Sequence, residues 1–327
     1  MTKIFIVAPA NVVTGGPELL HQLGDALNRE TRLAWMLYAP FDKSHETPAP
    51  YIRYNVGPAR LDDIDRDSIV VLPEIYTKLI RRFPTPRIYF WWLSVDDFFH
   101  HAGFTAPLGP IGGRNLIAKS YIGQLRQHVE RHLYQSEYAR EFLVSQSLAP
   151  SSRVSDYLAE EYVKELAKPA STPRENLVVY NPKKGRRRTR QILRALRQSD
   201  GPMPEVVPLA GMTRSQVCEL LGRAKLYIDF GGHPGKDRIP REAVALGACV
   251  LVNRRGSALN SVDIPIPDEF KIDDRTSGFA KVAADRIRLM MADFERQSPK
   301  FEAYRQKIAA EPADFLADVQ SLFLTRS

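Results

Sequence analysis

Short apolar runs alternate with helical patterns through the first half of the chain. The segment Pro17–Asn28 repeats its leucines at the spacing of one helical face, so that face is predicted to pack on a sheet. Further helices are predicted near Leu116–His132 and at Glu137–Val144. The predicted strands of this half are Lys3–Ala8, Leu33–Tyr38, Ile69–Leu72, Arg87–Ser94 and Leu133–Ser136. Strands that alternate with helices indicate a parallel sheet covered on both faces.

A linker-like stretch from Lys164 to Arg174 interrupts this alternation, because it gathers Pro, Ser and Thr residues. The alternation then begins again and ends in an amphipathic helical tail from Gly278 onward. The predicted strands here are Asn176–Tyr180, Glu205–Ala210, Leu226–Phe230 and Cys249–Asn253, and the predicted helices are Thr189–Arg197, Ser215–Ala224 and Arg241–Leu246. A chain of 327 residues suits two such α/β domains. Ligands of these folds bind beyond the carboxyl ends of the strands.

The formal net charge is +8 and the isoelectric point is about 9.4. Such a bias favours anionic partners, namely nucleic acid, an anionic membrane or phosphorylated ligands. The apolar run Ile4–Ala8 is too short for a signal peptide, and no stretch approaches the roughly 18 apolar residues that span a bilayer. The only cysteines, Cys218 and Cys249, lack metal-ligand spacing and favour a reducing compartment. We therefore predict a cytoplasmic protein.

The run Thr14, Gly15, Gly16, Pro17 and Glu18 lies between the first predicted strand and its helix. Its glycines permit a tight turn and the close approach of a ligand to the backbone. The helix start behind them offers free N–H groups, as a phosphate or acceptor loop requires. The spacing is not GxGxxG, so a dinucleotide fingerprint is absent. The alternative is a plain strand-to-helix turn.

Lys183 and Lys184 directly follow a predicted strand and precede Gly185. A lysine at the carboxyl end of a strand, beside a glycine turn, can neutralise a phosphate group. The basic run continues through Arg186–Arg190. The alternative is therefore a solvated basic patch, or a nucleic-acid contact that includes these arginines.

The segment Asp229–Ala243 holds the densest set of candidate residues. A predicted strand ends in glycines, basic side chains follow, and a helix begins near Pro240. Backbone N–H groups at that helix start, together with Lys236 and Arg238, suit a diphosphate. Glu242 is expected in the first turn, where a carboxylate can reach a ribose hydroxyl pair. The alternative role for Glu242 is compensation of the helix dipole.

Asp96, Asp97 and His100 follow the fourth predicted strand, where a general base for an attacking hydroxyl is expected. The alternative is an Asp-rich helix cap. The other histidines are not spaced convincingly as metal ligands. His128 and His132 are four residues apart, but no glutamate follows His128 as in HExxH. We therefore predict that no metal and no other cofactor is required.

In this order, the motifs resemble the GT-B-fold glycosyltransferases of bacterial surface-polysaccharide synthesis (O-antigen or capsule) over nearly the whole chain. Thr14–Glu18 resembles their acceptor-side loop, and Gln135–Leu143 resembles the segment that closes their first domain. Gly211–Thr213, Leu220–Gly235 and Arg241–Gly247 resemble their nucleotide-sugar region. The resemblance implies two Rossmann-like parallel-sheet domains that face a central cleft, with a helical C-terminus. Residues 1–170 would form the acceptor side, and residues 171–327 would bind the nucleotide sugar.

The resemblance also implies roles for single residues toward the donor. Glu242 would hold the ribose, Lys183 or Lys184 the diphosphate, and Met212 with Thr213 would lie near the base. The full donor-binding set is Lys183, Lys184, Gly211, Met212, Thr213, His233, Gly235, Lys236, Arg238 and Glu242. The C-terminal helix would return onto the first domain.

The chain departs from the family pattern at one position. Many retaining members carry two glutamates in the spacing E-x7-E, and Glu242 matches the second. Pro234 stands at the place of the first, beside His233. Whether this chain makes the sugar contact of the family's first glutamate therefore stays open. The choice between retention and inversion of configuration at the sugar stays open with it.

The implied activity is transfer of a sugar from a nucleotide sugar to a glycan or lipid-linked acceptor. The basic surplus, including Arg81, Arg82, Arg126 and Arg131, would hold the protein on the anionic inner face of the cell membrane. A nucleotide-sugar epimerase of the same fold is the alternative. A basic nucleic-acid-binding protein is less supported, because no RRM, KH or helix-turn-helix pattern occurs, and no nucleic-acid partner is expected.

Overall fold

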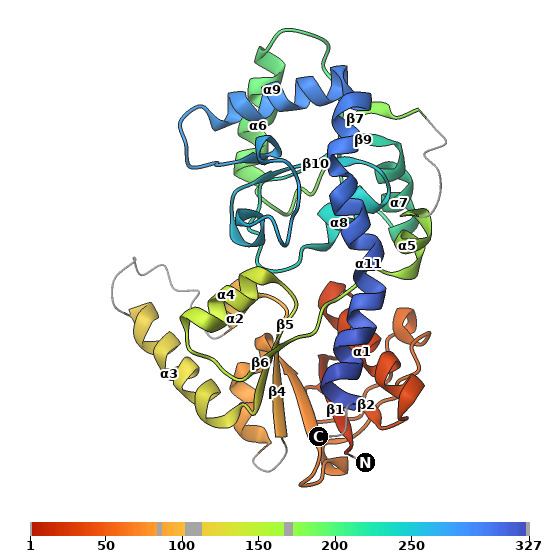
Figure 1. Cartoon of the computed structure of the whole chain (residues 1–327), viewed down its shortest axis with the longest axis vertical. Helices are drawn as coiled ribbons and strands as arrows, with labels where there is room; N and C mark the ends of the chain where they lie inside the picture. The colour runs from red at the N-terminus through yellow and green to blue at the C-terminus, as the bar shows by residue number, and fades with distance from the viewer. Residues whose placement is uncertain (1, 84–86, 102–112, 167–172, 325–327) are drawn as a thin grey trace. The chain divides into compact units, whose positions relative to one another are not determined.

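The computed structural model describes residues 2–83, 87–101, 113–166 and 173–324. Its internal contacts divide the chain into two compact units, and Figure 1 labels many of their helices and strands. The first unit comprises Met1–Asp156 with Ala313–Ser327, and the second comprises Tyr157–Pro312. Each unit is an α/β structure built on one parallel sheet.

This division differs from the expected boundary near residue 170. Helix α5 (Glu160–Leu166) packs against α8 (Arg238–Ala245), so the chain enters the second unit before the linker-like stretch. The expected second domain, residues 171–327, also included the end of the chain. In the structure this end belongs to the first unit, where Asp318 binds Arg153 at 3.0 Å. Residues 167–172 of the linker lie outside the described residues.

The first unit contains a six-stranded sheet in the order β2-β1-β3-β4-β5-β6, in which the described pairings are parallel. Its strands are β1 (Ile4–Pro9), β2 (Ala34–Ala39), β3 (Ile69–Pro73), β4 (Arg87–Trp92), β5 (Arg131–Tyr134) and β6 (Ser151–Arg153). The prediction of β5 at Leu133–Ser136 was wrong by two residues, because Arg131 and His132 pair with β4. Strand β6 has no apolar residue and lies at the edge, so the hydrophobic pattern does not reveal it.

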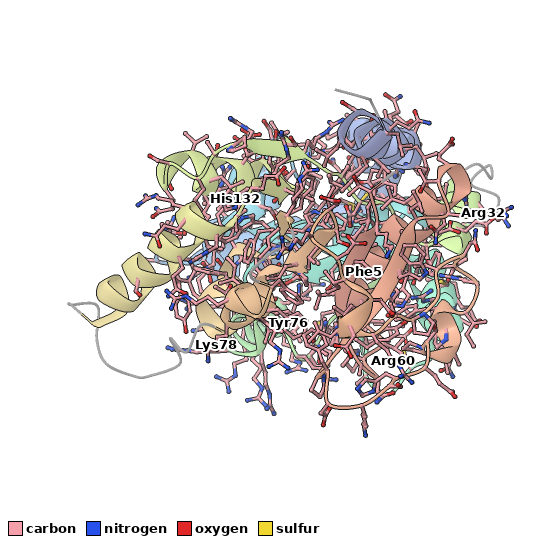
Figure 2. The ribbon with its side chains drawn as sticks, turned by 90° about the horizontal axis from the view of Figure 1, so that it is seen from below. Phe5, Arg32, Arg60, Tyr76, Lys78 and His132 are labelled. Atoms are coloured by element: carbon pink, nitrogen blue, oxygen red, sulfur yellow. The ribbon has the colours of Figure 1, made fainter. Side chains whose placement is uncertain are left out.

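Helices α1 (Gly15–Glu30), α2 (Val95–His101), α3 (Gly113–His128) and α4 (Glu137–Ser145) connect these strands, with the 3₁₀ segments η1 (Ala49–Tyr51), η2 (Leu61–Asp63) and η3 (Glu74–Arg82). Phe5 on β1 is 1% exposed, and Trp92 on β4 is fully buried. Exposed charged side chains such as Arg32, Arg60 and Lys78 lie at the periphery, away from Phe5 (Figure 2). Buried apolar area, at roughly 25 cal/mol per Å², is therefore the main stabilising contribution to this unit.

The second unit contains a five-stranded parallel sheet in the order β11-β10-β9-β7-β8. Its strands are β7 (Glu175–Tyr180), β8 (Glu205–Pro208), β9 (Ala224–Asp229), β10 (Cys249–Asn253) and β11 (Lys271–Ile272). The predictions of β7 to β10 are confirmed, whereas β11 is too short to be recognised from its two residues. Helices α6 (Arg186–Gln198) and α9 (Phe279–Ala292) pack side by side (Figure 1).

The remaining elements of this part of the chain are α7 (Arg214–Arg223), α10 (Phe294–Gln297), α11 (Glu302–Val319), the 3₁₀ segments η4 (Gly256–Leu259), η5 (Asp268–Phe270) and η6 (Ser298–Phe301), and the π turn η7 (Gln320–Leu324). The helical C-terminus is therefore confirmed. Helix α11 contains Pro312, at which the division between the two units falls.

Within the described ranges, no helix has both the length and the apolar character needed to cross a membrane. Cys218 is partly buried, Cys249 is buried, and both are free thiols. Burial raises the pKa of the Cys249 thiol to about 12. This cysteine therefore stays protonated and packs as a small apolar side chain.

Two helix-interior glycines allow a matched test of the packing in the first unit. A Cβ on Gly24 of α1 would lie 2.6 Å from the side chain of Val56, whereas a Cβ on Gly123 of α3 would meet nothing within 4 Å. We expect Gly24→Ala to lower the free energy of unfolding by about 1–3 kcal/mol through overpacking. Gly123→Ala should raise it by about 0.5–1 kcal/mol, because alanine favours the helix. Urea titrations measure both changes in the free energy of unfolding. Changes of the same sign in the two variants would contradict the packing of α1 on Val56.

Candidate functional site

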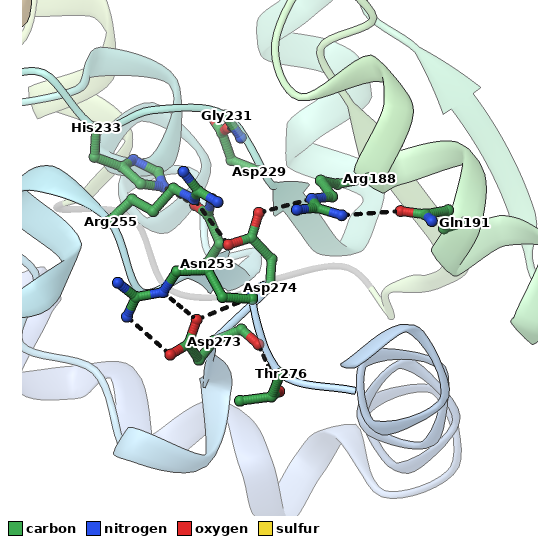
Figure 3. Close-up of polar contacts among 11 residues, drawn as sticks. Arg188, Gln191, Asp229, Gly231, His233, Asn253, Arg255, Asp273, Asp274 and Thr276 are labelled. Atoms are coloured by element: carbon green, nitrogen blue, oxygen red, sulfur yellow. Dashed lines mark hydrogen bonds and ion pairs between the residues drawn. The ribbon is translucent and has the colours of Figure 1, made fainter. Parts of the chain in front are cut away.

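Residues that follow four neighbouring strands meet at the carboxyl edge of the second sheet. Lys184 follows β7, Asp229 ends β9, Asn253 ends β10 and Asp274 follows β11. These four strands are consecutive in the sheet order. Figure 3 shows Asp229, Asn253 and Asp274 around this edge. The edge is the place where ligands of parallel α/β sheets bind.

Asp237 links two of these strand ends. Lys184 Nζ donates to Asp237 Oδ1 at 2.7 Å, and His233 Nδ1 lies 2.7 Å from Asp237 Oδ2. His233 Nε2 lies 2.9 Å from Asn253 Oδ1 (Figure 3). One carboxylate therefore positions the ammonium group that follows β7 and the imidazole that follows β9.

Electrostatics favour the charged form of the His233–Asp237 pair. Burial by itself lowers the pKa of His233, but the hydrogen bond and the charge of Asp237 outweigh burial, so the pKa lies above its usual value. Burial likewise raises the pKa of Asp237, while His233 and Lys184 lower it by more, so it lies below its usual value. Imidazolium, carboxylate and ammonium are therefore the favoured states of this trio.

Helix α8 begins beside this trio without a side-chain cap. Asp is a preferred N-cap residue, but Asp237 makes no capping hydrogen bond although it occupies the N-cap position. Its two oxygens instead bind Lys184 and His233. The first N–H groups of α8 therefore receive no bond from Asp237. Together with the positive end of the helix dipole they suit an anionic group.

Two glycines bring the neighbouring turns onto the end of β9. Gly185 has a φ of +58°, and a Cβ there would lie 2.2 Å from the carbonyl oxygen of Phe230. Gly256 has a φ of +51°, and a Cβ there would lie 1.9 Å from the carbonyl oxygen of His233. Only glycine fits both the left-handed backbone and the close approach. The turns after β7 and β10 therefore pack directly against the backbone that carries His233.

Asp274 ties two arginines to the same edge. Its carboxylate accepts Arg188 Nε at 3.0 Å and Arg255 Nε at 2.8 Å (Figure 3). Arg188 also lies over the ring of Phe279, 5.2 Å from its centroid. Arg188 is therefore fixed by contacts within the second unit. The alternative interpretation of the whole Arg186–Arg190 run as a solvated basic patch does not apply to this residue.

Lys236 and Glu242 are placed differently from the expectation. Lys236 lies 2.9 Å from the buried carboxylate of Glu311, which also binds Arg241 at 2.7 Å. Helix α8 begins at Arg238, so Glu242 lies beyond its first turn, and that placement was wrong. Compensation of the helix dipole is therefore not favoured for Glu242, because the effect fades beyond the first turn.

Glu242 instead faces α5. It is 9% exposed. Burial, and next the charge of Glu242, raise the pKa of Tyr162 on α5. The two side chains are therefore neighbours, and a buried glutamate beside a tyrosine hydroxyl can bind polar groups of a ligand.

The remaining donor candidates lie in the segments that follow β7, β8 and β9, up to the first residue of α8. Gly211 has a φ of +67°, and Thr213 caps α7 through a reciprocal bond with Gln216. Lys183 and Thr213 are exposed, Met212 and Arg238 are partly buried, and Gly235 is buried. Thr213 therefore has a structural role in the capping of α7, and its proximity to a nucleotide base stays a prediction.

Asp229, His233 and Asp237 also offer three ligand atoms that all lie within 4.8 Å of one another. In this arrangement Lys184 and His233 already bind the two oxygens of Asp237. A metal ion would have to displace the contact on whichever oxygen it binds, and the ammonium group of Lys184 would repel it. The residues present therefore fit a metal ion poorly.

In the first unit, the predicted glycine-rich turn is the start of a helix. Gly15 and Gly16 are the first residues of α1, and Thr14 is its N-cap. A Cβ on Gly16 would meet only Leu93, at 3.7 Å, and neither glycine has a positive φ. The prediction of a tight turn there was wrong, because α1 begins before Pro17. Contact of this helix start with a ligand stays a prediction.

Glu18 of the same run is buried. Its Oε1 accepts Arg53 Nη2 at 2.5 Å and the hydroxyl group of Tyr54 at 3.1 Å. The carboxylate therefore joins α1 to the segment that follows η1. This contact gives Glu18 a structural role that the sequence pattern does not show.

Asp96 and Asp97 lie in the first turn of α2, directly after β4. Ser94 Oγ accepts the backbone N–H of Asp97 at 3.1 Å and caps the helix. The hydroxyl group of Tyr138 donates to Asp96 Oδ1 at 3.0 Å. Because Ser94 supplies the cap, the aspartates are not needed for it. His100 lies on α2, but its side chain is outside the described residues.

Two side chains that sequence reasoning did not assign to the site hold the loop before these aspartates. Glu74, directly after β3, accepts the backbone N–H of Leu93 at 2.9 Å. Gln135, directly after β5, donates to the carbonyl oxygen of Leu93 at 2.5 Å. Burial raises the pKa of Glu74 to about 8; backbone N–H groups oppose this rise, and the charge of Asp97 adds to it. The only sequence signal is a glutamate that directly follows an apolar strand.

Solved structures with the same fold cover nearly the whole chain. Sucrose-phosphate synthase from Thermosynechococcus elongatus is 12% identical, with a TM-score of 0.66 over 99% of this chain and 98% of that chain. Anabaena HepE in complex with UDP and glucose is 10% identical, with a TM-score of 0.64 over 100% of both chains. The catalytic domain of starch synthase IV from Arabidopsis thaliana, bound to ADP and acarbose, is 12% identical, with a TM-score of 0.57 over 98% of this chain and 99% of that chain.

These likenesses confirm the predicted fold class of two parallel-sheet α/β domains with a helical C-terminus. At such low identity they establish the fold alone. No protein-family model and no curated protein matches the chain by sequence.

The high pKa of Glu74 predicts a pH-dependent stability. In the unfolded chain this carboxyl loses its proton near pH 4.5, but in the folded protein it keeps the proton until about pH 8. The free energy of unfolding therefore falls as the pH rises through this window, by at most about 1.4 kcal/mol per pH unit. Glu74→Gln should remove this contribution, so urea titrations from pH 5 to pH 8 should show a stability difference that grows with pH in favour of the variant.

The matched control is Glu141→Gln, because Glu141 is exposed on α4. Its pH profile should run parallel to that of the parent protein. If the profiles of Glu74→Gln and the parent were also parallel, Glu74 would not be a buried, protonated group.

Proposed function

We propose that this protein is a glycosyltransferase that takes a sugar from a nucleoside diphosphate sugar. The observation that carries the proposal is the trio Lys184, Asp237 and His233 at the uncapped start of α8. One carboxylate positions two cationic groups beside the start of α8, at the carboxyl edge of a parallel sheet. The solved structures of the same fold that contain UDP or ADP support this assignment.

The chemistry of sugar transfer matches these groups. Cleavage of the bond between the sugar and the diphosphate leaves negative charge on the departing diphosphate. Lys184, protonated His233 and the start of α8 would stabilise that charge without reorganisation, which is the largest contribution in many enzymes. In this proposal no metal ion is required.

The nucleoside would bind beside the diphosphate. Glu242, buried next to Tyr162, is proposed to accept the ribose hydroxyl groups, and Met212 with Thr213 to lie near the base. Gly235 and Arg238 would contribute backbone and charge contacts near the diphosphate. Lys236 would contribute through the position of Glu311 and not through a free ammonium group, because its Nζ lies 2.9 Å from that carboxylate.

The acceptor would be activated by the first unit. Asp96 or Asp97 is proposed to accept the proton of the attacking hydroxyl group, with His100 as a further candidate. Glu74 and Gln135 bind the backbone of Leu93 and thereby hold the loop that precedes the aspartates. We propose a glycan or lipid-linked acceptor and a role in surface-polysaccharide synthesis at the cytoplasmic face of the membrane, for which the positive net charge of +8 is the support.

Removal of Lys184 tests the donor site. Lys184→Gln should weaken the binding of UDP or ADP by about tenfold or more, because a charge-assisted contact to phosphate contributes roughly 1.5–3 kcal/mol. Glu242→Gln should weaken nucleoside binding as well. Isothermal titration calorimetry with both nucleotides measures these changes.

The comparison variant is Lys183→Gln, because Lys183 is exposed and adjacent, and a much smaller loss is expected from it. Lys281→Gln, an exposed lysine on α9, serves as the charge-matched control. Equal affinity of the parent and Lys184→Gln for both nucleotides would place the diphosphate elsewhere.

Removal of the candidate bases tests the reaction. Asp96→Asn and Asp97→Asn should each fold normally, and at least one should lower the release of nucleoside diphosphate from the donor by about 100-fold, since general-base catalysis supplies 10²–10⁴-fold. Donor affinity should change little, and Glu141→Gln on the neighbouring α4 is the control. Parent-like turnover in both variants would remove the aspartates from the proposal. Interconversion of the donor sugar without acceptor would instead identify an epimerase.

A further inference from the structure

A cavity of about 670 Å³ lies in the first unit, and none of its lining residues belongs to the candidate site described above. It is lined by residues of β4, β5 and β6, by Asp318 of α11 and by η7. Arg87, Arg131 and Ser151 are the first residues of the three strands. The cavity therefore includes the amino ends of the three strands and extends along β5 and β6 to Tyr134 and Arg153. Its volume suits a small organic ligand.

Arg131 is the central charged group of this cavity. Its Nη1 donates to Ser152 Oγ at 2.9 Å. Its Nε is buried and has no hydrogen-bond partner among the residues that the structure describes. A buried guanidinium N–H without an acceptor is unfavourable, so an oxygen atom from a ligand or solvent is required there. A negatively charged oxygen satisfies it best.

Two further arginines are fixed around Arg131 by carboxylates. Arg87 binds Glu130 through Nε and Nη2, and Arg153 binds Asp318 through Nε and Nη2, at 3.0–3.1 Å for Arg153. Within the described chain, the Nη1 of each arginine has no protein acceptor. With Glu130, which binds Arg87 beside the cavity, three guanidinium groups stand against two carboxylates among the described residues, an excess of one positive charge. This excess of positive charge selects an anion.

We propose that this cavity binds a phosphate group, which Arg131 contacts through Nε while Arg87 and Arg153 contact it through Nη1. The planar guanidinium groups match the oxygen geometry of a phosphate. Tyr134 and Leu322, which also line the cavity, provide surface for the organic part of a phosphate ester. The phosphate belongs either to a free phosphorylated molecule or to the headgroup of a phospholipid. The proposal does not depend on the proposed function.

The first arm of the test uses inorganic phosphate and the full chain. The signal of the Arg131 Nε–H group is identified in ¹⁵N-correlated spectra as the one that Arg131→Gln removes. We expect it to shift saturably with phosphate at an ionic strength held constant with chloride. Ser151→Glu places a negative charge on an exposed position at the cavity and should weaken this binding about tenfold or more. Ser120→Glu, exposed on α3, is the matched control and should not change it.

The second arm separates the two sources of phosphate by co-sedimentation with vesicles of phosphatidylcholine alone or with phosphatidylglycerol added. A free phosphorylated ligand is supported if inorganic phosphate saturates the Arg131 signal and Arg131→Gln leaves vesicle binding unchanged. A lipid headgroup is supported if binding to the phosphatidylglycerol vesicles falls in both Arg131→Gln and Ser151→Glu. The proposal is overturned if phosphate acts no differently from chloride on the Arg131 signal and neither variant alters vesicle binding.

Discussion

The second unit is organised around one buried carboxylate that serves two cationic groups at once. Asp237 gives one oxygen to Lys184 and the other to His233, and it makes no capping hydrogen bond to the helix that it begins. Without this carboxylate, the partly exposed ammonium group of Lys184 and the buried imidazolium group of His233 would lie side by side and would repel each other. The positions of both cations at the strand ends therefore depend on Asp237.

The same principle recurs at other points of the chain. Glu311 joins Lys236 to Arg241, and Asp274 joins Arg188 to Arg255. In each case two basic side chains share one acid from another part of the chain. A chain with a surplus of 8 positive charges thereby keeps many of its cations in fixed places within the fold. Such fixed charge stabilises a polyanionic ligand more than mobile surface lysines do, because its position is set before binding.

Much of the fold could be predicted from the sequence, because the buried strands are apolar runs between helical patterns. What could not be predicted was set by tertiary contacts. Strand β6 has no apolar residue, so it is defined by its pairing with β5 at the edge of the sheet. Helix α5 packs on α8 although its composition continues into a linker. The end of the chain joins the first unit through Asp318, a contact that no local pattern encodes.

The candidate site likewise has features that could be predicted from the sequence and features that could not. Strand periodicity placed Lys184 and His233 at strand ends, but it could not show that Asp237 would join them, because that contact spans separate turns. Glu74 shows the opposite case. Its role depends on complete burial against the backbone of Leu93, and burial of a single glutamate after a strand has no sequence signature.

The discontinuity of the first unit has a consequence for biosynthesis. Residues 157–312 form a continuous unit, so they can fold as soon as they leave the ribosome. The first unit, although its synthesis begins earlier, is not complete until residues 313–324 have emerged and Asp318 reaches Arg153 and the backbone of Ser155. The sheet of the first unit therefore has an incompletely covered edge while the second unit is synthesised.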